Sequence, residues 1–229
     1  MKIPHITALL PMKGNSERVP GKNIRPFGGE PLFFHILKTL EKVEAIDKVI
    51  INTDSPKIKE LASVFPKVIF HDRPASICGG HIPMNTIIDY DLSHVSGEYF
   101  LQTHSTNPLM QPETVQKAIE TFFANIDTYD SLFSVNRIQQ RLYDKNFVPL
   151  NHNPAILQNT QDLDPIFAEN SCIYIFSKES FAKNGKNRLG LKPYAFEMTQ
   201  QESYDIDTED DFQIAEIIFN GQNNNNGEK

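Results

Sequence analysis

The sequence of 229 residues predicts a three-layer α/β/α fold built around a mostly parallel β-sheet. The first observation is an alternation of short, β-branched apolar runs with amphipathic stretches, which continues through residue 135. The second is that polar or glycine-bearing loops follow several of the apolar runs directly. Because the carboxyl ends of parallel strands meet at one edge of a sheet, we expect these loops to gather around a ligand.

The elements of the first half have clear start and stop signals. Pro11 closes the first strand, and Pro31 stands at the expected start of the first helix. Ser55 is the expected N-cap of the second helix, with Pro56 as its first residue. Strands are predicted at residues 5–11, 47–54, 67–70, 97–104 and 130–135, and helices at 31–43, 55–65, 84–93 and 111–124.

The second half is less regular. Between residues 136 and 169 the pattern dissolves into Gln, Asn, Asp and Pro, which is typical of an arm that packs on a partner or of a mobile flap. Strand-like runs return at residues 171–176 and 192–198, followed by a helical pattern at 208–219. We therefore expect one domain over residues 1–220 and a disordered, asparagine-rich tail at 221–229.

The bulk composition excludes several classes of protein. With 39% apolar and 22% charged residues, the chain has the composition of an ordinary globular protein. Its net charge of −7 argues against a nucleic-acid partner. Cys78 and Cys172 have no metal-site or redox spacing, which favours a reducing compartment. The apolar run before Pro11 is too short for a signal-peptide core or a membrane span, so we expect a cytoplasmic protein with no membrane partner.

A basic loop follows the first predicted strand. Between Leu9 and Leu32, four cationic side chains occur together with four glycines: Lys13, Arg18, Lys22 and Arg25 with Gly14, Gly21, Gly28 and Gly29. Backbone N–H groups of such turns favour oxyanions, and the cations add full charge, so polyphosphate is the expected ligand. The loop matches neither a Walker A motif nor G-x-G-x-x-G, which disfavours a nucleotide kinase or a dehydrogenase.

A pair of aspartates precedes the last predicted helix. Asp205 and Asp207 in "DIDT" lie on one side of an extended segment, because side chains alternate with period two. Two carboxylates on one side suit Mg²⁺, or Mn²⁺ in its place, together with phosphate oxygens. The alternative is simple helix entry, since Thr208 and Asp211 have the spacing of a capping box.

These features occur in a known order. The stretch "LLPMKGNSERVPGKNIRPFGGEPL" resembles the N-terminal signature of the CMP-sialic acid synthetases, the acylneuraminate cytidylyltransferases. The segments "INTDSPKI", "DRPASI", "FLQTHSTNPL", "ENSCIYIF" and "SYDIDTEDDFQIAE" are similar to later motifs of that family, over about 200 residues in all. The resemblance implies a Rossmann-like nucleotidyltransferase fold. It also implies an enzyme that couples CTP to the anomeric hydroxyl of a nine-carbon sugar acid and releases pyrophosphate.

The resemblance also implies roles for single residues. Lys13, Ser16 and Lys22 would face the triphosphate, with Gly14 in the same loop and Arg18 compensating for a lysine at position 13 where the family usually has arginine. Asn23 and Arg73 would hold the cytidine, and Asp205 and Asp207 the metal. We expect catalysis by positioning and charge stabilisation, with Lys13, Lys22 and Asp207 as the catalytic residues.

The acceptor side is less closely matched. Gln102, Asn170 and Tyr174 are the expected sugar-binding residues, since amide and hydroxyl groups suit a polyhydroxy ligand. "QTHSTNPL" is two residues longer than the family's motif, and we interpret His104 within it, like His152, as an ordinary loop residue.

The acceptor therefore stays open. A nine-carbon sialic-type acid is favoured, and legionaminic, pseudaminic and 3-deoxy-manno-octulosonic acids are alternatives. A catalytically inactive nucleotide-binding homologue is the alternative from another class. The region at 136–169 resembles the family's dimerisation arm in position, so a homodimer is expected.

Overall fold

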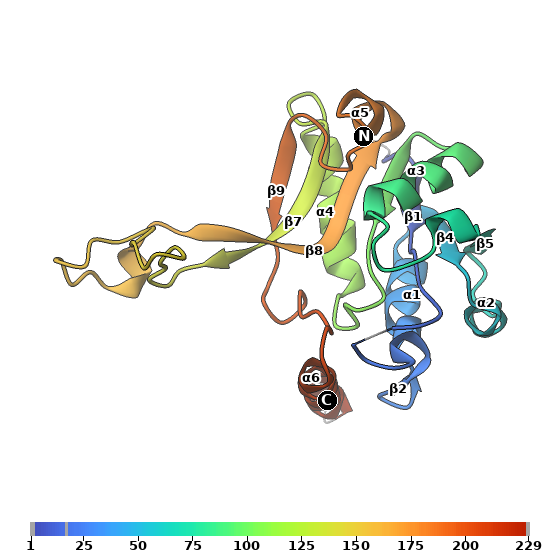
Figure 1. The fold of residues 1–229 in the computed structure, drawn as a ribbon, viewed down its shortest axis with the longest axis horizontal. Coiled ribbons are helices and arrows are strands. Elements are labelled where there is room, and N and C mark those ends of the chain that lie inside the picture. Colours follow the sequence, from blue (N-terminus) through green and yellow to red (C-terminus); the bar gives the residue numbers. More distant parts are fainter. Residues whose placement is uncertain (1–2, 17, 228–229) are drawn as a thin grey trace.

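A seven-stranded sheet forms the centre of the protein, whose computed structural model describes residues 3–16 and 18–227 (Figure 1). Its strand order is β5-β4-β1-β6-β8-β7-β9, and β8 alone runs antiparallel to its neighbours. The prediction of a mostly parallel sheet is therefore confirmed. The strands are β1 (Ile6–Leu9), β4 (Ile46–Thr53), β5 (Val68–Asp72), β6 (Tyr99–Gln102), β7 (Ser131–Ile138), β8 (Ile166–Ser177) and β9 (Pro193–Glu197).

Helices cover both faces of this sheet. The helices are α1 (Leu32–Lys42), α2 (Pro56–Ala62), α3 (Met84–His94), α4 (Pro112–Ala124) and α5 (Lys178–Lys183). Alternation along β1 sends Ala8 into the core beneath α1, α2 and α4, and Leu9 into the core beneath α3 and α5. The three-layer, Rossmann-like architecture is confirmed. Ser55 caps α2 as expected, because its Oγ accepts a hydrogen bond from the Ile58 N–H at 3.3 Å.

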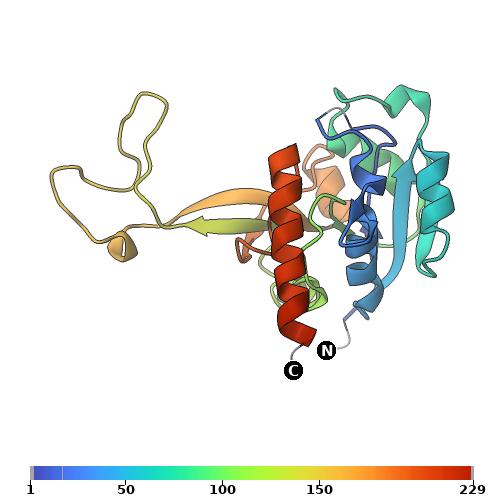
Figure 2. The ribbon, with the colours of Figure 1, turned by 90° about the horizontal axis from the view of Figure 1, so that it is seen from below.

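The arm is more regular at its base than the sequence predicts. β7 and β8 continue past the sheet as a two-stranded ribbon, with Val135 opposite Glu169 and Ile138 opposite Ile166. Residues 139–165 form the outer part and carry the short helix η3 (Thr160–Asp162). The arm projects away from the rest of the molecule in two perpendicular views (Figures 1 and 2).

The C-terminal helix α6 (Glu209–Gly227) is longer than expected. Residues 221–227, predicted to be disordered, continue the helix, and residues 228–229 lie outside the described part. Phe212 of α6 packs with Phe27 and Ile206 in a small core beside the basic loop. This packing stabilises the helix although its far end is polar. None of the helices described, α6 included, combines the length and apolar character that a membrane span requires.

Candidate functional site

A cavity of about 590 Å³ opens at the carboxyl ends of the parallel strands. The loop after β1, the loop after β5 and the loop after β6 all reach it, as expected for this type of sheet. The segment before α6 closes its other side. Nine predicted site residues line it: Lys13, Ser16, Arg18, Lys22, Asn23, Arg73, Asn170, Asp205 and Asp207. The structure thus brings together residues that are almost 200 positions apart.

The basic loop is shaped by two tight turns. Gly21, with a φ of 65°, precedes the short helix η1 (Lys22–Ile24), which places Lys22 in the cavity wall. The loop ends in a hairpin of β2 (Pro26–Phe27) and β3 (Glu30–Pro31). Arg25 leaves the site: it pairs with Glu209 at 2.6 Å, and its guanidinium stacks on Phe212. Three of the four cations therefore face the cavity, while Arg25 binds the loop to α6.

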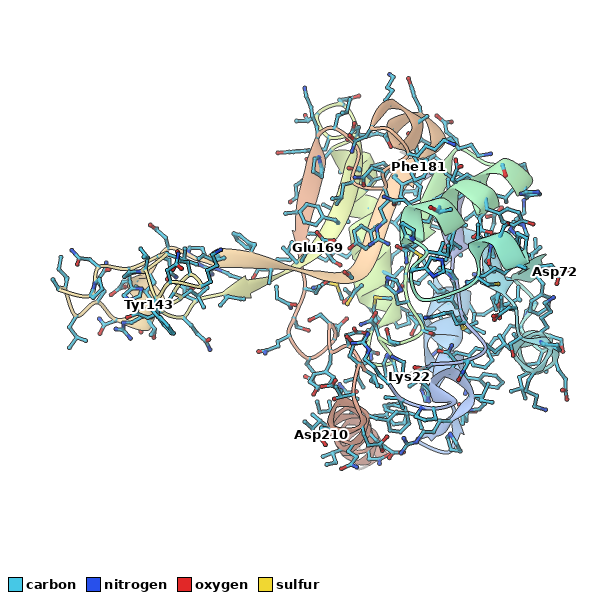
Figure 3. All side chains as sticks on the ribbon, in the orientation of Figure 1. Lys22, Asp72, Tyr143, Glu169, Phe181 and Asp210 are labelled. Atoms are coloured by element: carbon cyan, nitrogen blue, oxygen red, sulfur yellow. The ribbon has the colours of Figure 1, made fainter. Side chains whose placement is uncertain are left out.

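Lys22 and the acidic pair meet directly. Lys22 is buried, its ammonium donates to the Ile206 carbonyl, and it lies 3.9 Å from an Asp207 carboxylate oxygen. Arg18 reaches the same oxygen at 2.8 Å from the exposed side. Burial lowers the pKa of Lys22, while the charges of Asp205 and Asp207 oppose this shift. Figure 3 shows Lys22 at the lower end of the sheet, on the side of α6. The predicted cationic loop and acidic doublet thus meet in the lining of one cavity.

Asp205 and Asp207 offer carboxylate oxygens to the same space. The Asp205 side chain is open to the cavity, yet protein atoms around it reduce its hydration and raise its pKa. A smaller contribution in the same direction comes from the charge of Asp207. Two mutually repelling carboxylates are a donor set that fits a hard divalent cation together with ligand oxygens. The alternative role in helix entry belongs to Thr208, whose Oγ1 accepts from the Asp211 N–H at 3.2 Å, while Asp211 accepts from the Thr208 N–H.

Arg73 is held by a buried polar network. Its Nε donates to the Asn52 side-chain oxygen at 2.7 Å, and its Nη2 to the Asn52 carbonyl at 2.8 Å. The Asn52 amide in turn donates to Asp91 at 2.7 Å, and Asp91 also contacts His71 Nδ1 at 2.8 Å. Because a carboxylate only accepts, Asp91 fixes which end of the Asn52 amide faces Arg73. Sequence reasoning missed Asn52, Asp91 and His71, because only the packing of α3 on β4 and β5 brings them together.

Asn23 connects two of the loops. Its amide donates to the Lys13 carbonyl at 2.9 Å and accepts from the Ser105 hydroxyl at 2.7 Å. Gly14 takes a different place from the one expected. Its N–H donates to Asp54 at 2.7 Å, and a Cβ there would lie 2.9 Å from Ser55, so Gly14 packs behind the cavity wall.

The predicted acceptor residues divide into two sets. Asn170 lines the cavity, and the orientation of its amide is fixed because its oxygen accepts from the Cys172 N–H at 3.2 Å. Its Nδ2 is buried and has no partner among the described residues. Gln102 and Tyr174 lie behind the wall, where Tyr174 is fully buried. Gln102 and Tyr174 therefore do not line the cavity themselves and can influence it only by contacting side chains that do.

Two further side chains at this end were not recognised from sequence. Arg188 stacks on the Tyr174 ring, with 3.6 Å between the guanidinium carbon and the ring centroid, and donates to Gln102. His104 lines the cavity and is not the ordinary loop residue we expected. Its position in a stretch two residues longer than the related motif was the available signal. Arg188 had none, since it lies in the loop between α5 and β9, where the sequence shows no motif.

The sequence matches the family described as Cytidylyltransferase over residues 7–226. The chain belongs to the cytidylyltransferase family. This cytidylyltransferase is similar to N-acylneuraminate cytidylyltransferase A of Danio rerio, at 28% identity over 222 residues. The match covers 94% of this chain and 51% of that protein, so the chain spans about half the length of the fish relative.

A bacterial relative matches over nearly its whole length. CMP-N,N'-diacetyllegionaminic acid synthase of Legionella pneumophila is 25% identical over 232 residues, with 93% of this cytidylyltransferase and 96% of that protein covered. The fold agrees with the solved structure of CMP:2-keto-3-deoxy-manno-octonic acid synthetase complexed with CTP. The TM-score is 0.68 at 13% identity, covering 95% of this chain and 99% of that chain.

Proposed function

We propose that this cytidylyltransferase transfers the cytidylyl group of CTP to the anomeric hydroxyl of a nonulosonic, sialic-type sugar acid and releases pyrophosphate. The observation that carries the proposal is the single cavity in which Lys22 and Arg18 face Asp205 and Asp207. The names of the fish and Legionella relatives support an acidic nine-carbon acceptor.

The nucleotide occupies the end of the cavity formed by the basic loop. Lys13, Ser16, Arg18 and Lys22 contact the triphosphate, where three positive charges offset its negative charge. Arg73, held rigid by Asn52, and Asn23 contact the cytidine. Such fixed donors lose little freedom on binding, which favours tight positioning of the α-phosphate.

The acceptor occupies the opposite end, beside Asn170. The buried, unpartnered Nδ2 of Asn170 is a donor that needs an oxygen, and a sugar hydroxyl or carboxylate supplies one. The acceptor hydroxyl oxygen bonds to the α-phosphorus as the bond from that phosphorus to the oxygen bridging the β-phosphate breaks, and the hydroxyl proton passes to solvent or to a carboxylate of Asp205 or Asp207. Lys13 and Lys22 then neutralise charge on the leaving pyrophosphate.

Asp205 and Asp207 are the residues that would hold a divalent cation, Mg²⁺ or alternatively Mn²⁺. Their fit follows from two carboxylates that open into one cavity and repel each other. When bound, the cation neutralises charge on phosphate oxygens. Arg18, exposed and paired with Asp207 at 2.8 Å, can move aside without uncovering a buried charge.

A panel of nucleotides and acidic sugars tests the function. Purified protein with Mg²⁺ is supplied with CTP, UTP, ATP or GTP and with sialic, legionaminic, pseudaminic or 3-deoxy-manno-octulosonic acid, and pyrophosphate release is recorded. We expect turnover with CTP and a nine-carbon acid, with slower turnover for other pairs. CTP binding without turnover on any acid would support the inactive nucleotide-binding alternative.

We also propose that the arm packs against a second copy to form a homodimer. Exposed apolar side chains gather on it, with Leu157 94% and Phe147 84% exposed. The set is Tyr143, Phe147, Val148, Leu150, Ile156, Leu157 and Phe167. Light scattering after size exclusion should give twice the chain mass, and the double variant Phe147→Ser, Leu157→Ser should give the monomer.

The free thiols of Cys78 and Cys172 support the expected reducing, cytoplasmic environment.

A further inference from the structure

His104 has a fixed hydrogen-bonding role that follows from its neighbours. It comes from the longer loop after β6 and lines the cavity near Asn170 and Ser171. Its Nε2 lies 3.2 Å from Nε2 of Gln102. Two nitrogens at this distance form a hydrogen bond only if one donates and the other accepts.

The orientation of the Gln102 amide decides which nitrogen donates. Arg188 donates from Nη1 to Oε1 of Gln102, and a guanidinium has no acceptor, so this end of the amide is the oxygen. The other end donates to the Thr103 carbonyl at 2.8 Å, which only accepts. Both contacts place the NH₂ group toward His104.

His104 Nε2 is therefore the acceptor, and the proton of the neutral ring is on Nδ1. A protonated ring would place two donors face to face. Burial, together with the charges of Arg188 and Lys22, lowers the pKa of His104 to about 4, which keeps the ring neutral at pH 7. Nδ1 has no hydrogen-bond partner within the described ranges 3–16 and 18–227.

The charges at this end favour an anion. No carboxylate forms an ion pair with Arg188 among the described residues, although its guanidinium is largely surrounded by protein. Burial lowers the pKa of Arg188, while the nearby ionisable groups of Tyr174 and Glu169 oppose this shift; its guanidinium donates to the side-chain oxygen of Gln102. A ligand carboxylate would therefore find a neutral N–H donor at His104, a buried cation behind it and the unpartnered amide of Asn170.

We propose that His104 is a specificity-determining residue that donates its Nδ1–H to the carboxylate of the acceptor, and that Gln102 is a positioning residue that fixes the tautomer. The proposal rests on the function proposed above. It assigns the extra length of the loop after β6 to recognition of the sugar acid.

The tautomer is tested without turnover. In protein labelled with ¹⁵N-histidine, the His104 signals at pH 7 should show a neutral ring protonated on Nδ1. Gln102→Glu places an acceptor opposite Nε2 and should move the proton to Nε2 or protonate the ring. A wild-type ring protonated on Nε2, or no change in Gln102→Glu, would overturn the positioning role.

Kinetics test recognition of the acceptor. His104→Leu removes the donor and should raise the KM of the acceptor about 10- to 100-fold, as for loss of a hydrogen bond to a charged group, with little change in the KM of CTP. His104→Asn keeps an N–H near the Nδ1 position and should recover most of the loss. His5→Leu, at an exposed site before β1, is the matched control. An unchanged acceptor KM in an active His104→Leu enzyme overturns this inference alone, whereas a wild-type protein inactive on every acid overturns the proposed function.

Discussion

Arg73 Nε and Asn52 Oδ1 are 2.7 Å apart, so an arginine of the cavity wall is held by an amide at the end of β4. Asp91, behind this amide, accepts from its other end and prevents it from turning. Burial raises the pKa of Asp91, while hydrogen bonds from Asn52 and His71 oppose that rise. The protein thus retains a buried carboxyl group beneath the proposed cytidine site.

Replacing Asn52 should weaken nucleotide binding selectively. Asn52→Ala removes the side-chain acceptor for the Arg73 Nε–H, and we expect the KM of CTP to rise about tenfold, as for loss of a buried hydrogen bond to a charged group. Because this variant also removes one of the two hydrogen-bond partners of Asp91, Arg73→Lys is the second test: it keeps the charge and loses the fork. Steady-state kinetics should show the KM of the acceptor little changed in both. An equal rise in both KM values would contradict a role confined to the nucleotide.

Lys22 should be required for the chemical step. Lys22→Met removes the buried ammonium between the phosphates and the acidic pair, and we expect kcat/KM for CTP to fall at least about 100-fold. Lys117→Met, exposed on α4, is the control and should match the wild type. If Lys22→Met folded normally and kept more than half of the wild-type kcat/KM, the proposed contact with the triphosphate would be wrong.

Activity should depend on a divalent cation held by Asp205 and Asp207. A chelator should abolish turnover, and Asp205→Asn should raise the Mg²⁺ concentration for half-maximal activity about tenfold or more. Asp210→Asn changes an exposed carboxylate in the same segment and should leave that concentration unchanged. Full activity in the chelator would refute the assignment.

The capping box at the start of α6 should contribute to stability. Asp211 accepts from the Thr208 N–H at 2.8 Å, and these contacts hold its pKa below the usual value. Asp211→Ala should lower the free energy of unfolding by about 1 kcal/mol, measured in urea. Asp210→Ala removes a charge from the same turn but no capping hydrogen bond, so it should lower the free energy of unfolding by less than Asp211→Ala. Equal losses would mean that the helix dipole, not the cap, is responsible.

His104 should make stability depend on pH. Its folded pKa of about 4 lies below the ordinary 6.5, so the unfolded chain binds more protons between these values. This contribution is complete above pH 6.5, falls as the pH is lowered through the window, and amounts to at most about 3 kcal/mol. Between pH 6.5 and 4.5, the free energy of unfolding should decrease less for His104→Asn than for the wild type. Parallel pH curves for the two proteins would exclude this titration.

The parts of the site that sequence predicts are those with local spacing. Lys22 and Asp207 belong to short motifs whose charge and period identify them, and the structure brings both motifs to one cavity. Arg188 and Asp91 belong to none, because their roles arise from contacts with Gln102 and Asn52, 86 and 39 residues away. Such contacts become visible only when the strands are in place.

In the fold, too, some elements can be predicted from the sequence and others cannot. The sheet strands from Ile6–Leu9 to Tyr99–Gln102 follow from short apolar runs bounded by turns. The ribbon of residues 135–138 and 166–169 does not, because Asn136, Arg137 and Glu169 interrupt its short apolar stretches and the strands are joined by backbone pairing. The helix beyond residue 220 was missed for a related reason: asparagine disfavours helix, and the preceding turns, packed through Phe212, extend it.

The proposed transfer is tested by following the α-phosphate itself. CTP labelled at the α-phosphorus is incubated with Mg²⁺, a nine-carbon sugar acid and the protein, and the products are separated. We predict that the label appears in a CMP-sugar with one pyrophosphate released for each, and that Lys22→Met and Asp207→Asn nearly abolish this transfer. Label that remains in CTP with every acid, or transfer that persists in both variants, would contradict it.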